Sequence, residues 1–242
     1  MRLKKGLNLS SNYSINFNTP KRSKKLIKFI VVHYTGMKSQ SQAIKKLCDS
    51  RSKVSAHYFI KDDGKIINLV PDLYEAWHAG KSSWKNLKKL NRYSIGIEIN
   101  NPGHDHGYRK FKDKQISALK KLLSNLTNKY KIKNCNILGH SDIAPDRKKD
   151  PGEKFPWKDL ANKNLSIWHN LKENKIKILR NQKINSREET IFYNNLYKFG
   201  YPKINKNKLF LIKAFQRRFR QSLINGKIDK ECFIISKSLT KS

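Results

Sequence analysis

Segments with the pattern of strands and of helices alternate between residues 26 and 140, and few fold classes accommodate that order. Residues 26–34 form a continuous apolar run with β-branched side chains, which is typical of a strand buried on both faces. Residues 39–48 indicate a short helix. Apolar side chains recur with helical spacing from Asp113 to Tyr130, which predicts an amphipathic helix with Asp113 as its N-cap.

Four further strands are predicted between and after these helices. Residues 56–60 and 65–70 alternate on either side of an Asp-Asp-Gly turn, as the two strands of a hairpin do. Residues 94–100 place Glu98 on the face opposite three isoleucines, and residues 136–138 form a last short strand. This order predicts an α/β fold, in which a mixed central sheet is flanked by helices.

The chain carries 53 basic and 18 acidic residues, for a net charge of +35. Such a charge is typical of nucleic-acid binders, but here it runs through the whole chain, which favours a general compositional bias. Attraction to a polyanion, such as an acidic cell-wall polymer, is the alternative.

No apolar run reaches the length of a membrane helix, and residues 1–25 lack the apolar core of a signal peptide. Cys48, Cys135 and Cys232 lack the spacing of a disulfide framework or a zinc knuckle. We therefore expect a cytoplasmic protein without a membrane span or a specific nucleic-acid partner, with the periplasm as the alternative location.

The segment Gly139–Gly152 combines the residue types of a metal site. His140 follows a predicted strand, Asp150 stands on a proline-closed loop, and Lys148 lies between them. A third ligand must come from elsewhere, and the best candidate is His33 in the first predicted strand. Two imidazoles and one carboxylate suit a catalytic zinc ion, which keeps a fourth position open for water.

Residues 26–160 resemble the zinc-dependent N-acetylmuramoyl-L-alanine amidases of the type 2 family, which are related to peptidoglycan-recognition proteins and phage T7 lysozyme. Five segments carry the resemblance in order: residues 31–35 (VVHYT), 54–58 (VSAHY), 76–80 (AWHAG), 94–99 (SIGIEI) and the segment from Gly139. The resemblance implies a peptidoglycan-recognition-protein-like fold, one zinc ion on His33, His140 and Asp150, and Glu98 and Lys148 as the catalytic pair.

The chemistry of the family assigns a role to each of these residues. Zinc lowers the pKa of water to about 7 and polarises the amide carbonyl. Glu98 would accept a proton from the water and pass it to the leaving amine, while Lys148 would hold positive charge beside the oxyanion. Some relatives have a cysteine at the position of Asp150 or a tyrosine near position 56; Ala56 leaves the proton transfer to Glu98 alone.

Four neighbouring residues are weaker candidates for substrate contacts: Tyr34, His57, Trp77 and His78. For His57, inside a predicted hairpin strand, a structural role is favoured. Trp77 and His78 precede a glycine and either cap the core or face the substrate; the resemblance favours the substrate.

Other polar residues near the motif are not expected to bind a metal or to take part in catalysis. His104 and His106 have the spacing of a second metal site, but a solvated loop near the cleft explains them better. Asp142 and Asp146 are interpreted as hydrogen-bonding loop residues, and His169 receives no role.

Helical spacing returns in the last part of the chain, at residues 187–199, 208–223 and 229–239, after a Lys- and Asn-rich stretch. We expect a catalytic domain at 1–165, a connector at 166–186 and an all-α three-helix domain at 187–242. This last domain resembles, less specifically, the peptidoglycan-binding module of some amidases. The matching residues are Leu196, Gly200, Tyr201, Ala214, Phe215, Gln216, Phe219, Arg220, Gly226 and Asp229. The alternative is a generic helical cap.

The predicted function is hydrolysis of the amide bond between N-acetylmuramic acid and L-alanine, in peptidoglycan or in an anhydro-muropeptide, by a monomer. The alternative is a non-catalytic peptidoglycan-binding protein, against which the presence of all three ligands and both catalytic residues argues. Nucleic-acid binding would rest on charge alone.

Overall fold

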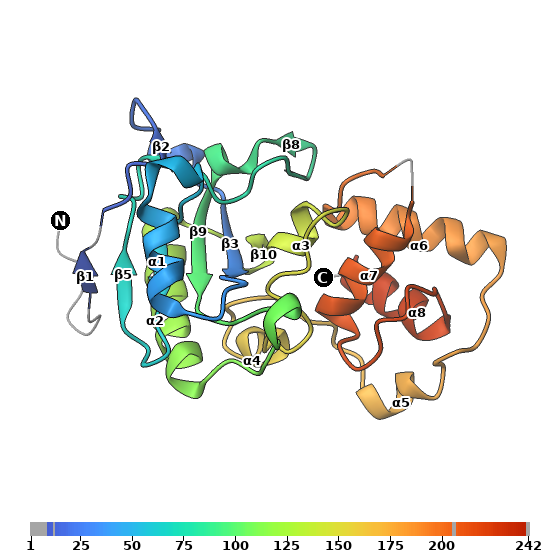
Figure 1. Ribbon diagram of the computed structural model, residues 1–242. Helices are drawn as coiled ribbons and strands as arrows, with labels where there is room; N and C mark the ends of the chain where they lie inside the picture. Colours follow the sequence, from blue (N-terminus) through green and yellow to red (C-terminus); the bar gives the residue numbers. More distant parts are fainter. Residues whose placement is uncertain (1–8, 12, 205–206, 241–242) are drawn as a thin grey trace.

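The computed structural model describes residues 9–11, 13–204 and 207–240, and its centre is a six-stranded sheet (Figure 1). The strand order is β1-β5-β4-β9-β3-β10, and every neighbouring pair is parallel except β4 with β5. The strands are β1 (Leu9–Ser11), β3 (Phe29–Tyr34), β4 (Tyr58–Ile60), β5 (Ile66–Asn68), β9 (Ser94–Ile99) and β10 (Ile137–Gly139). The expected mixed sheet is thereby confirmed.

Two short antiparallel pairs lie outside this sheet, and the described residues form eight α-helices. The pairs are β2 (Phe17–Asn18) with β6 (Glu75–Ala76), and β7 (Ser83–Trp84) with β8 (Leu87–Lys88). The helices are α1 (Gln40–Cys48), α2 (Asp113–Tyr130), α3 (His140–Ile143), α4 (Trp157–Ala161), α5 (Glu173–Lys177), α6 (Ser186–Phe199), α7 (Leu209–Phe219) and α8 (Lys230–Leu239).

Alternation along β3 sends its side chains into two different cores. Ile30 and Val32 pack with α2, which covers one face of the sheet, while Val31 packs on the opposite face, in a core shared with α6, α7 and α8. α1 covers the β4–β5 end of that opposite face (Figure 1). His33 therefore lies on the face opposite α2, and the parallel register places it beside Glu98 of β9.

The strand ends explain why distant residues meet. β3, β9 and β10 run parallel, so their carboxyl ends lie at one edge of the sheet. His33 and Glu98 stand one residue before the ends of their strands, and His140 directly follows β10. Ligands and catalytic residues of open α/β sheets gather at this edge.

Several element boundaries differ from the sequence predictions. β3 begins at Phe29 rather than at residue 26, β4 begins at Tyr58 rather than at residue 56, and β5 spans Ile66–Asn68 rather than 65–70. Asp113 is the first residue of α2 rather than its N-cap, which is Lys112. α7 ends at Phe219 rather than at position 223, because Arg220 leaves the helical conformation with φ −138° and turns its guanidinium to Asp229, 2.5 Å away. The predicted connector contains the short helix α5.

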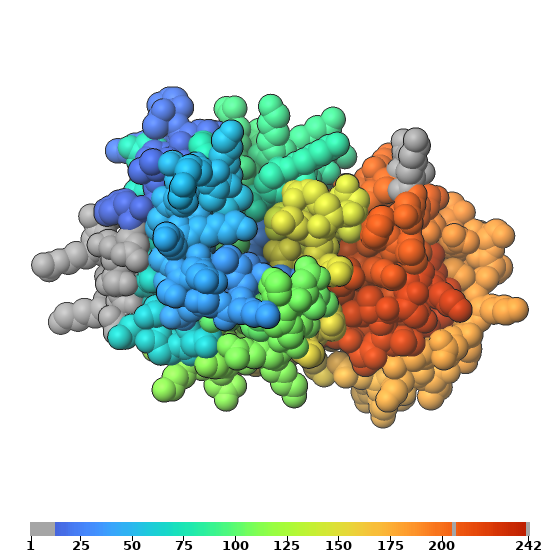
Figure 2. Space-filling view, in the orientation of Figure 1, coloured from blue at the N-terminus to red at the C-terminus, as the bar shows by residue number. Residues whose placement is uncertain are grey.

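The three C-terminal helices pack directly against the first part of the chain. One hydrophobic core includes Val31 and Leu138 of the sheet together with Phe192 of α6 and Phe215 of α7. Figure 2 shows the segment around residue 140 wedged between the first part of the chain and the C-terminal helices. No described helix has the length and apolar character needed to cross a membrane. The segment 1–25, in which the sequence predicts no signal peptide, lies partly outside the described residues.

Candidate active site

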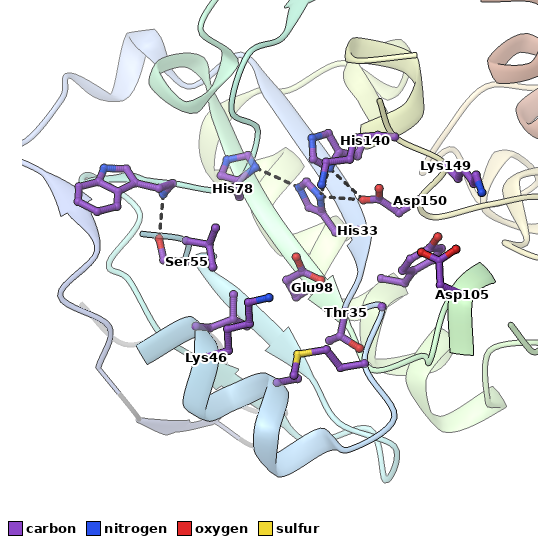
Figure 3. Close-up of a pocket in the computed structure, with 18 of the residues that line it drawn as sticks. His33, Thr35, Lys46, Ser55, His78, Glu98, Asp105, His140, Lys149 and Asp150 are labelled. Carbon is purple, nitrogen blue, oxygen red and sulfur yellow. Dashed lines mark hydrogen bonds and ion pairs between the residues drawn. The ribbon is translucent and has the colours of Figure 1, made fainter. Parts of the chain in front are cut away.

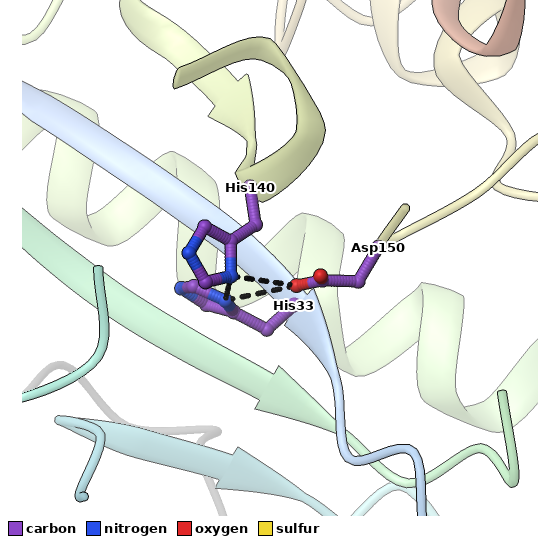
Figure 4. A group of neighbouring side chains, drawn as sticks. All are labelled: His33, His140 and Asp150. Carbon is purple, nitrogen blue, oxygen red and sulfur yellow. Dashed lines mark hydrogen bonds and ion pairs between the residues drawn. The ribbon is translucent and has the colours of Figure 1, made fainter. Parts of the chain in front are cut away.

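Three ligand atoms form a small triangle at the carboxyl edge of the sheet (Figure 4). The Nδ1 atoms of His33 and His140 are 2.9 Å apart, and they lie 3.0 and 3.1 Å from Oδ2 of Asp150. All three residues are buried. Among the described residues this is the one His, Cys, Asp and Glu cluster with the geometry to hold a metal ion.

Hydrogen bonds around the triangle determine which nitrogen of each imidazole carries the proton. Nε2 of His140 lies 3.2 Å from the carbonyl oxygen of Ala79, which only accepts, so Nε2 is the protonated nitrogen. Its Nδ1 is then left with a lone pair that points at Asp150.

His33 is oriented by a chain of three hydrogen bonds. The Ser94 hydroxyl donates to the Leu90 carbonyl at 2.6 Å, so its oxygen accepts from Nε2 of His78 at 3.2 Å. Nδ1 of His78 then accepts from Nε2 of His33 at 3.1 Å. His33 is thereby fixed with its proton on Nε2 and a lone pair on Nδ1, as a metal-binding histidine requires.

This donor set fits a divalent cation. Two imidazole lone pairs and one carboxylate oxygen converge on one point, an arrangement that a bound cation satisfies. In a tetrahedral zinc site with metal–nitrogen bonds of about 2.0 to 2.1 Å, neighbouring ligand atoms stand about 3.3 Å apart, close to the observed triangle. The three residues could therefore hold a metal ion.

Electrostatics keep these groups in their ligand forms. Burial and the neighbouring His140 lower the pKa of His33 to about 4, so the ring stays neutral. Burial and the adjacent His33 and His57 lower the pKa of His78 in the same way.

Glu98 lies next to the triangle with an unused carboxylate oxygen. Its Oε2 is buried and has no hydrogen-bond partner among the described residues. Burial, assisted by the charge of Asp150, raises the pKa of Glu98 well above its ordinary value, and the positive charges of Lys148 and Lys46 oppose that rise. A carboxyl group with a raised pKa is suited to general acid and base chemistry near neutral pH.

A cavity of about 350 Å³ opens over these groups (Figure 3). Its lining includes the three candidate ligands and Glu98, together with four basic side chains: Lys46, Arg147, Lys148 and Lys149. The structure thus brings together all five residues for which the sequence predicts metal binding or catalysis.

The four predicted substrate contacts are placed differently from one another. Tyr34, Trp77 and His78 line the cavity. Both nitrogens of His78 are engaged within the protein, and the indole nitrogen of Trp77 donates to Asn18 at 2.8 Å. His57 is not among the residues that line it.

His57 lies in the protein interior and does not reach the cavity. It is fully buried, its Nδ1 accepts from the Gly96 amide at 2.9 Å, and its Nε2 lies 3.0 Å from the Tyr74 carbonyl oxygen. Burial and the nearby Arg22 guanidinium lower its pKa to about 3. Its surroundings are therefore those of a structural histidine.

The loop that contains His104 and His106 is hydrogen-bonded to the segment that follows Asp150. His104 lies 2.8 Å from the Tyr34 hydroxyl through Nδ1 and 3.1 Å from Glu153 through Nε2. Tyr108, stacked on His104, donates from its hydroxyl to the Pro151 carbonyl at 2.7 Å. These contacts hold Pro151 and Glu153, which follow the candidate ligand Asp150 in the chain.

Sequence reasoning missed two residues that support the ligands. Ser94 ends the hydrogen-bond chain to His33, and Arg147 donates to the carbonyl oxygens of Ala79 and Lys81 at 2.5 and 2.6 Å, behind His140. A glycine inside a strand often marks the close approach of another group, and Gly96 is such a glycine. A Cβ at Gly96 would lie 2.3 Å from the His78 ring, so this glycine is the sequence signal for the position of His78.

Fold and site together define an α/β protein with a candidate metal centre, a neighbouring carboxyl group and a basic cavity. Residues 22–153 match the family model described as N-acetylmuramoyl-L-alanine amidase. The chain belongs to this amidase family, and the type 2 resemblance drawn from the sequence is confirmed.

Individual relatives agree with the family assignment. The chain is 34% identical over 229 residues to N-acetylmuramoyl-L-alanine amidase AmiD of Escherichia coli (strain K12), covering 88% of this chain and 82% of that protein. The structure of that E. coli amidase in complex with anhydro-N-acetylmuramic acid-L-Ala-D-gamma-Glu-L-Lys superposes with a TM-score of 0.80 at 31% identity, covering 93% of this chain and 92% of the other.

A second relative matches a shorter region. The chain is 41% identical over 105 residues to 1,6-anhydro-N-acetylmuramyl-L-alanine amidase AmpD of Citrobacter freundii, covering 43% of this chain and 54% of that protein. The chain thus spans about half the length of this relative, whereas the match to the E. coli amidase extends into the C-terminal helices.

Proposed function

We propose that the chain is a zinc amidase that releases the stem peptide from anhydro-muropeptides by hydrolysing the bond between N-acetylmuramic acid and L-alanine. This proposal is carried by the convergence of His33 Nδ1, His140 Nδ1 and Asp150 Oδ2. Beside them lies Oε2 of Glu98, which has no hydrogen-bond partner in the part of the chain that the structure describes. The anhydro substrate is favoured because the similar E. coli amidase forms a complex with an anhydro-muropeptide substrate.

In this proposal His33, His140 and Asp150 hold the zinc ion. When bound, zinc supplies positive charge that acidifies water and polarises the amide carbonyl. Glu98 takes a proton from the attacking water and delivers it to the leaving amine of L-alanine. Lys148, whose charge already acts on Glu98 and on His33, stabilises the negative charge that develops on the amide oxygen.

The basic lining of the cavity supports an acidic peptide substrate. Besides Lys148, which is assigned to the amide oxygen, Lys46 and Lys149 face a cavity whose acidic residues are Glu98, Asp105 and Asp150. Asp150 and Glu98 are engaged in metal binding and proton transfer in this proposal, which leaves positive charge available for the carboxylates of a stem peptide.

The test uses purified protein with one equivalent of zinc and two substrates, an anhydro-muropeptide and intact peptidoglycan, with release of free stem peptide followed by mass spectrometry. We expect release from the anhydro-muropeptide, abolished by chelation and restored by zinc. The proposal fails if the zinc-loaded protein releases no stem peptide from either substrate. Release from intact peptidoglycan alone would reject the substrate preference but not the amidase activity.

The cytoplasmic location, the monomeric state and the wall-binding role of residues 187–242 stay predictions. Cell fractionation, sedimentation and co-sedimentation with insoluble peptidoglycan test them in turn.

A further inference from the structure

A buried carboxylate, Asp142, connects the candidate metal site to the C-terminal helices. Asp142 lies in α3, two positions after the candidate ligand His140, and it is fully buried. Its Oδ2 accepts from the Gly139 amide at 2.8 Å, which joins the carboxylate to the backbone at the start of α3. Any displacement of Asp142 therefore moves the residue next to His140.

The other partners of Asp142 come from the C-terminal part of the chain. The Tyr201 hydroxyl donates to Oδ1 at 2.8 Å, and the Arg218 guanidinium donates to Oδ2 in a short ion pair. Arg218 is 1% exposed and Tyr201 is 3% exposed. The two donors lie more than fifty residues along the chain from Asp142, so the contact depends entirely on how the C-terminal helices pack.

Arg218 also holds the strand that leads into α3. Its second guanidinium nitrogen donates to the Ile137 carbonyl oxygen of β10 at 3.0 Å, and its guanidinium carbon lies 4.2 Å from the centre of the Trp157 ring. One side chain of α7 thus contacts the chain on both sides of His140, before it at Ile137 and after it at Asp142.

The physical consequence follows from the cost of burying a charge. A buried carboxylate is tolerated only with a cationic partner and full hydrogen bonding, and removal of one partner leaves an uncompensated charge. If Arg218 were apolar, the buried Asp142 carboxylate would lose its cationic partner and would have to move toward water. That movement disturbs the turn that directs the His140 ring toward His33 and Asp150.

We propose that the C-terminal helical unit is part of the scaffold of the metal site, in which Arg218 and Tyr201 act as positioning residues that hold the ligand His140 through Asp142. This role goes beyond the amidase activity and is separate from any wall binding by the same unit. It rests on the proposed role of His140 as a metal ligand.

The test compares Arg218→Met with a matched control, Arg220→Met, in the full-length chain. Arg220 is equally buried, but it pairs with Asp229 and Asn225 inside the C-terminal unit. Each variant is examined for the unfolding temperature of the metal-free protein and for zinc affinity in competition with a chromophoric chelator. We expect both variants to unfold at lower temperature, but only Arg218→Met to bind zinc at least tenfold more weakly.

One further variant keeps the test decisive if Arg218→Met fails to fold, and a second isolates the effect of the buried charge where Arg218→Met does fold. Tyr201→Phe removes one hydroxyl from Asp142 and should weaken zinc binding several-fold. The double variant Asp142→Asn/Arg218→Met removes both buried charges and should recover zinc affinity relative to Arg218→Met. Wild-type zinc affinity in Tyr201→Phe, or equal losses in Arg218→Met and Arg220→Met, would overturn the proposal. Because zinc affinity is measured without substrate, an inactive wild type would reject the amidase function and leave this result intact.

Discussion

The hydrogen bond between His78 and His33 offers a direct test of how the candidate metal site is organised. Nδ1 of His78 accepts the Nε2 proton of His33 at 3.1 Å in a buried environment. In the variant His78→Leu the side chain keeps a comparable volume but loses this acceptor. The His33 proton is then left without a buried partner, and the tautomer with Nδ1 protonated, which cannot bind a metal through that atom, becomes more populated.

The size of the effect follows from the cost of the lost acceptor. A buried donor without a partner costs about 1 to 3 kcal/mol. Since about 1.4 kcal/mol corresponds to a factor of ten in affinity, His78→Leu should weaken metal binding about 5- to 150-fold. This range agrees with the factor of about 10 to 100 that is typical when the hydrogen-bond partner of a metal-bound histidine is removed.

Zinc competition with a chromophoric chelator measures the effect, and His78→Asn serves as the matched control. The asparagine Oδ1 atom occupies about the place of Nδ1 and keeps an acceptor for His33, so this variant should retain most of the zinc affinity. Ser94→Ala removes the far end of the hydrogen-bond chain and should have an intermediate effect. If His78→Leu binds zinc as tightly as the wild type, the proposed orientation of His33 is wrong.

Three other changes test separate parts of the molecule. Glu98→Gln should lower kcat about 10²- to 10⁴-fold with unchanged zinc affinity, because only proton transfer is lost; a variant that also loses zinc contradicts this assignment. Lys148→Met should lower kcat by a factor that corresponds to about 2.7 to 4 kcal/mol, with KM and bound zinc unchanged by steady-state kinetics and metal analysis. Burial would raise the pKa of Asp72, but hydrogen bonds led by that from Lys129 lower it overall. Asp72 therefore stabilises the fold above its unfolded pKa of about 3.9, and the contribution is lost as the pH falls through the lower folded pKa. Urea unfolding of wild type and Asp72→Asn should converge in acid; a gap that does not depend on pH would contradict this account.

Local sequence patterns were sufficient for the residues that lie on regular elements. The continuous apolar run predicted β3, and the alternation in residues 94–99 correctly separated Glu98 from the isoleucines that face α2. Once β3 and β10 are parallel neighbours, the approach of His33 and His140 follows from strand direction. The position of these residues is therefore encoded within short stretches of chain.

The supporting residues could not be predicted in this way because their partners are remote in sequence. Asp142 looks like an ordinary loop aspartate until the packing of α7 brings Arg218 to it across 76 positions. His57 and His78 each have an aromatic neighbour, and the sequence favoured a structural role for the first and a substrate contact for the second. Their actual partners could not be predicted: His78 contacts the candidate ligand His33, whereas His57 contacts Gly96 and Tyr74.

The hydrophobic core that the sheet shares with the C-terminal helices leads to a prediction about the expected domain boundary at residue 165. Trp84 is fully buried, and its ring lies 5.6 Å from that of Phe199 and 5.0 Å from that of Tyr201, both in the C-terminal part. Val31 and Leu138 belong to the same core. A fragment of residues 1–165 would expose these side chains wherever the C-terminal helices cover them.

Exposing one large apolar side chain costs about 1.5 to 3 kcal/mol, so exposing Trp84, Val31 and Leu138 together costs up to about 9 kcal/mol. The whole stability of a domain is about 5 to 15 kcal/mol. We therefore expect the fragment 1–165 to be unfolded or aggregated at temperatures where the full chain is folded, as measured by circular dichroism and size-exclusion chromatography. A monomeric fragment with the unfolding temperature of the full chain would show that the C-terminal helices are a separate module. It would also contradict a scaffold role for Arg218, because the fragment keeps Asp142 and lacks its cationic partner.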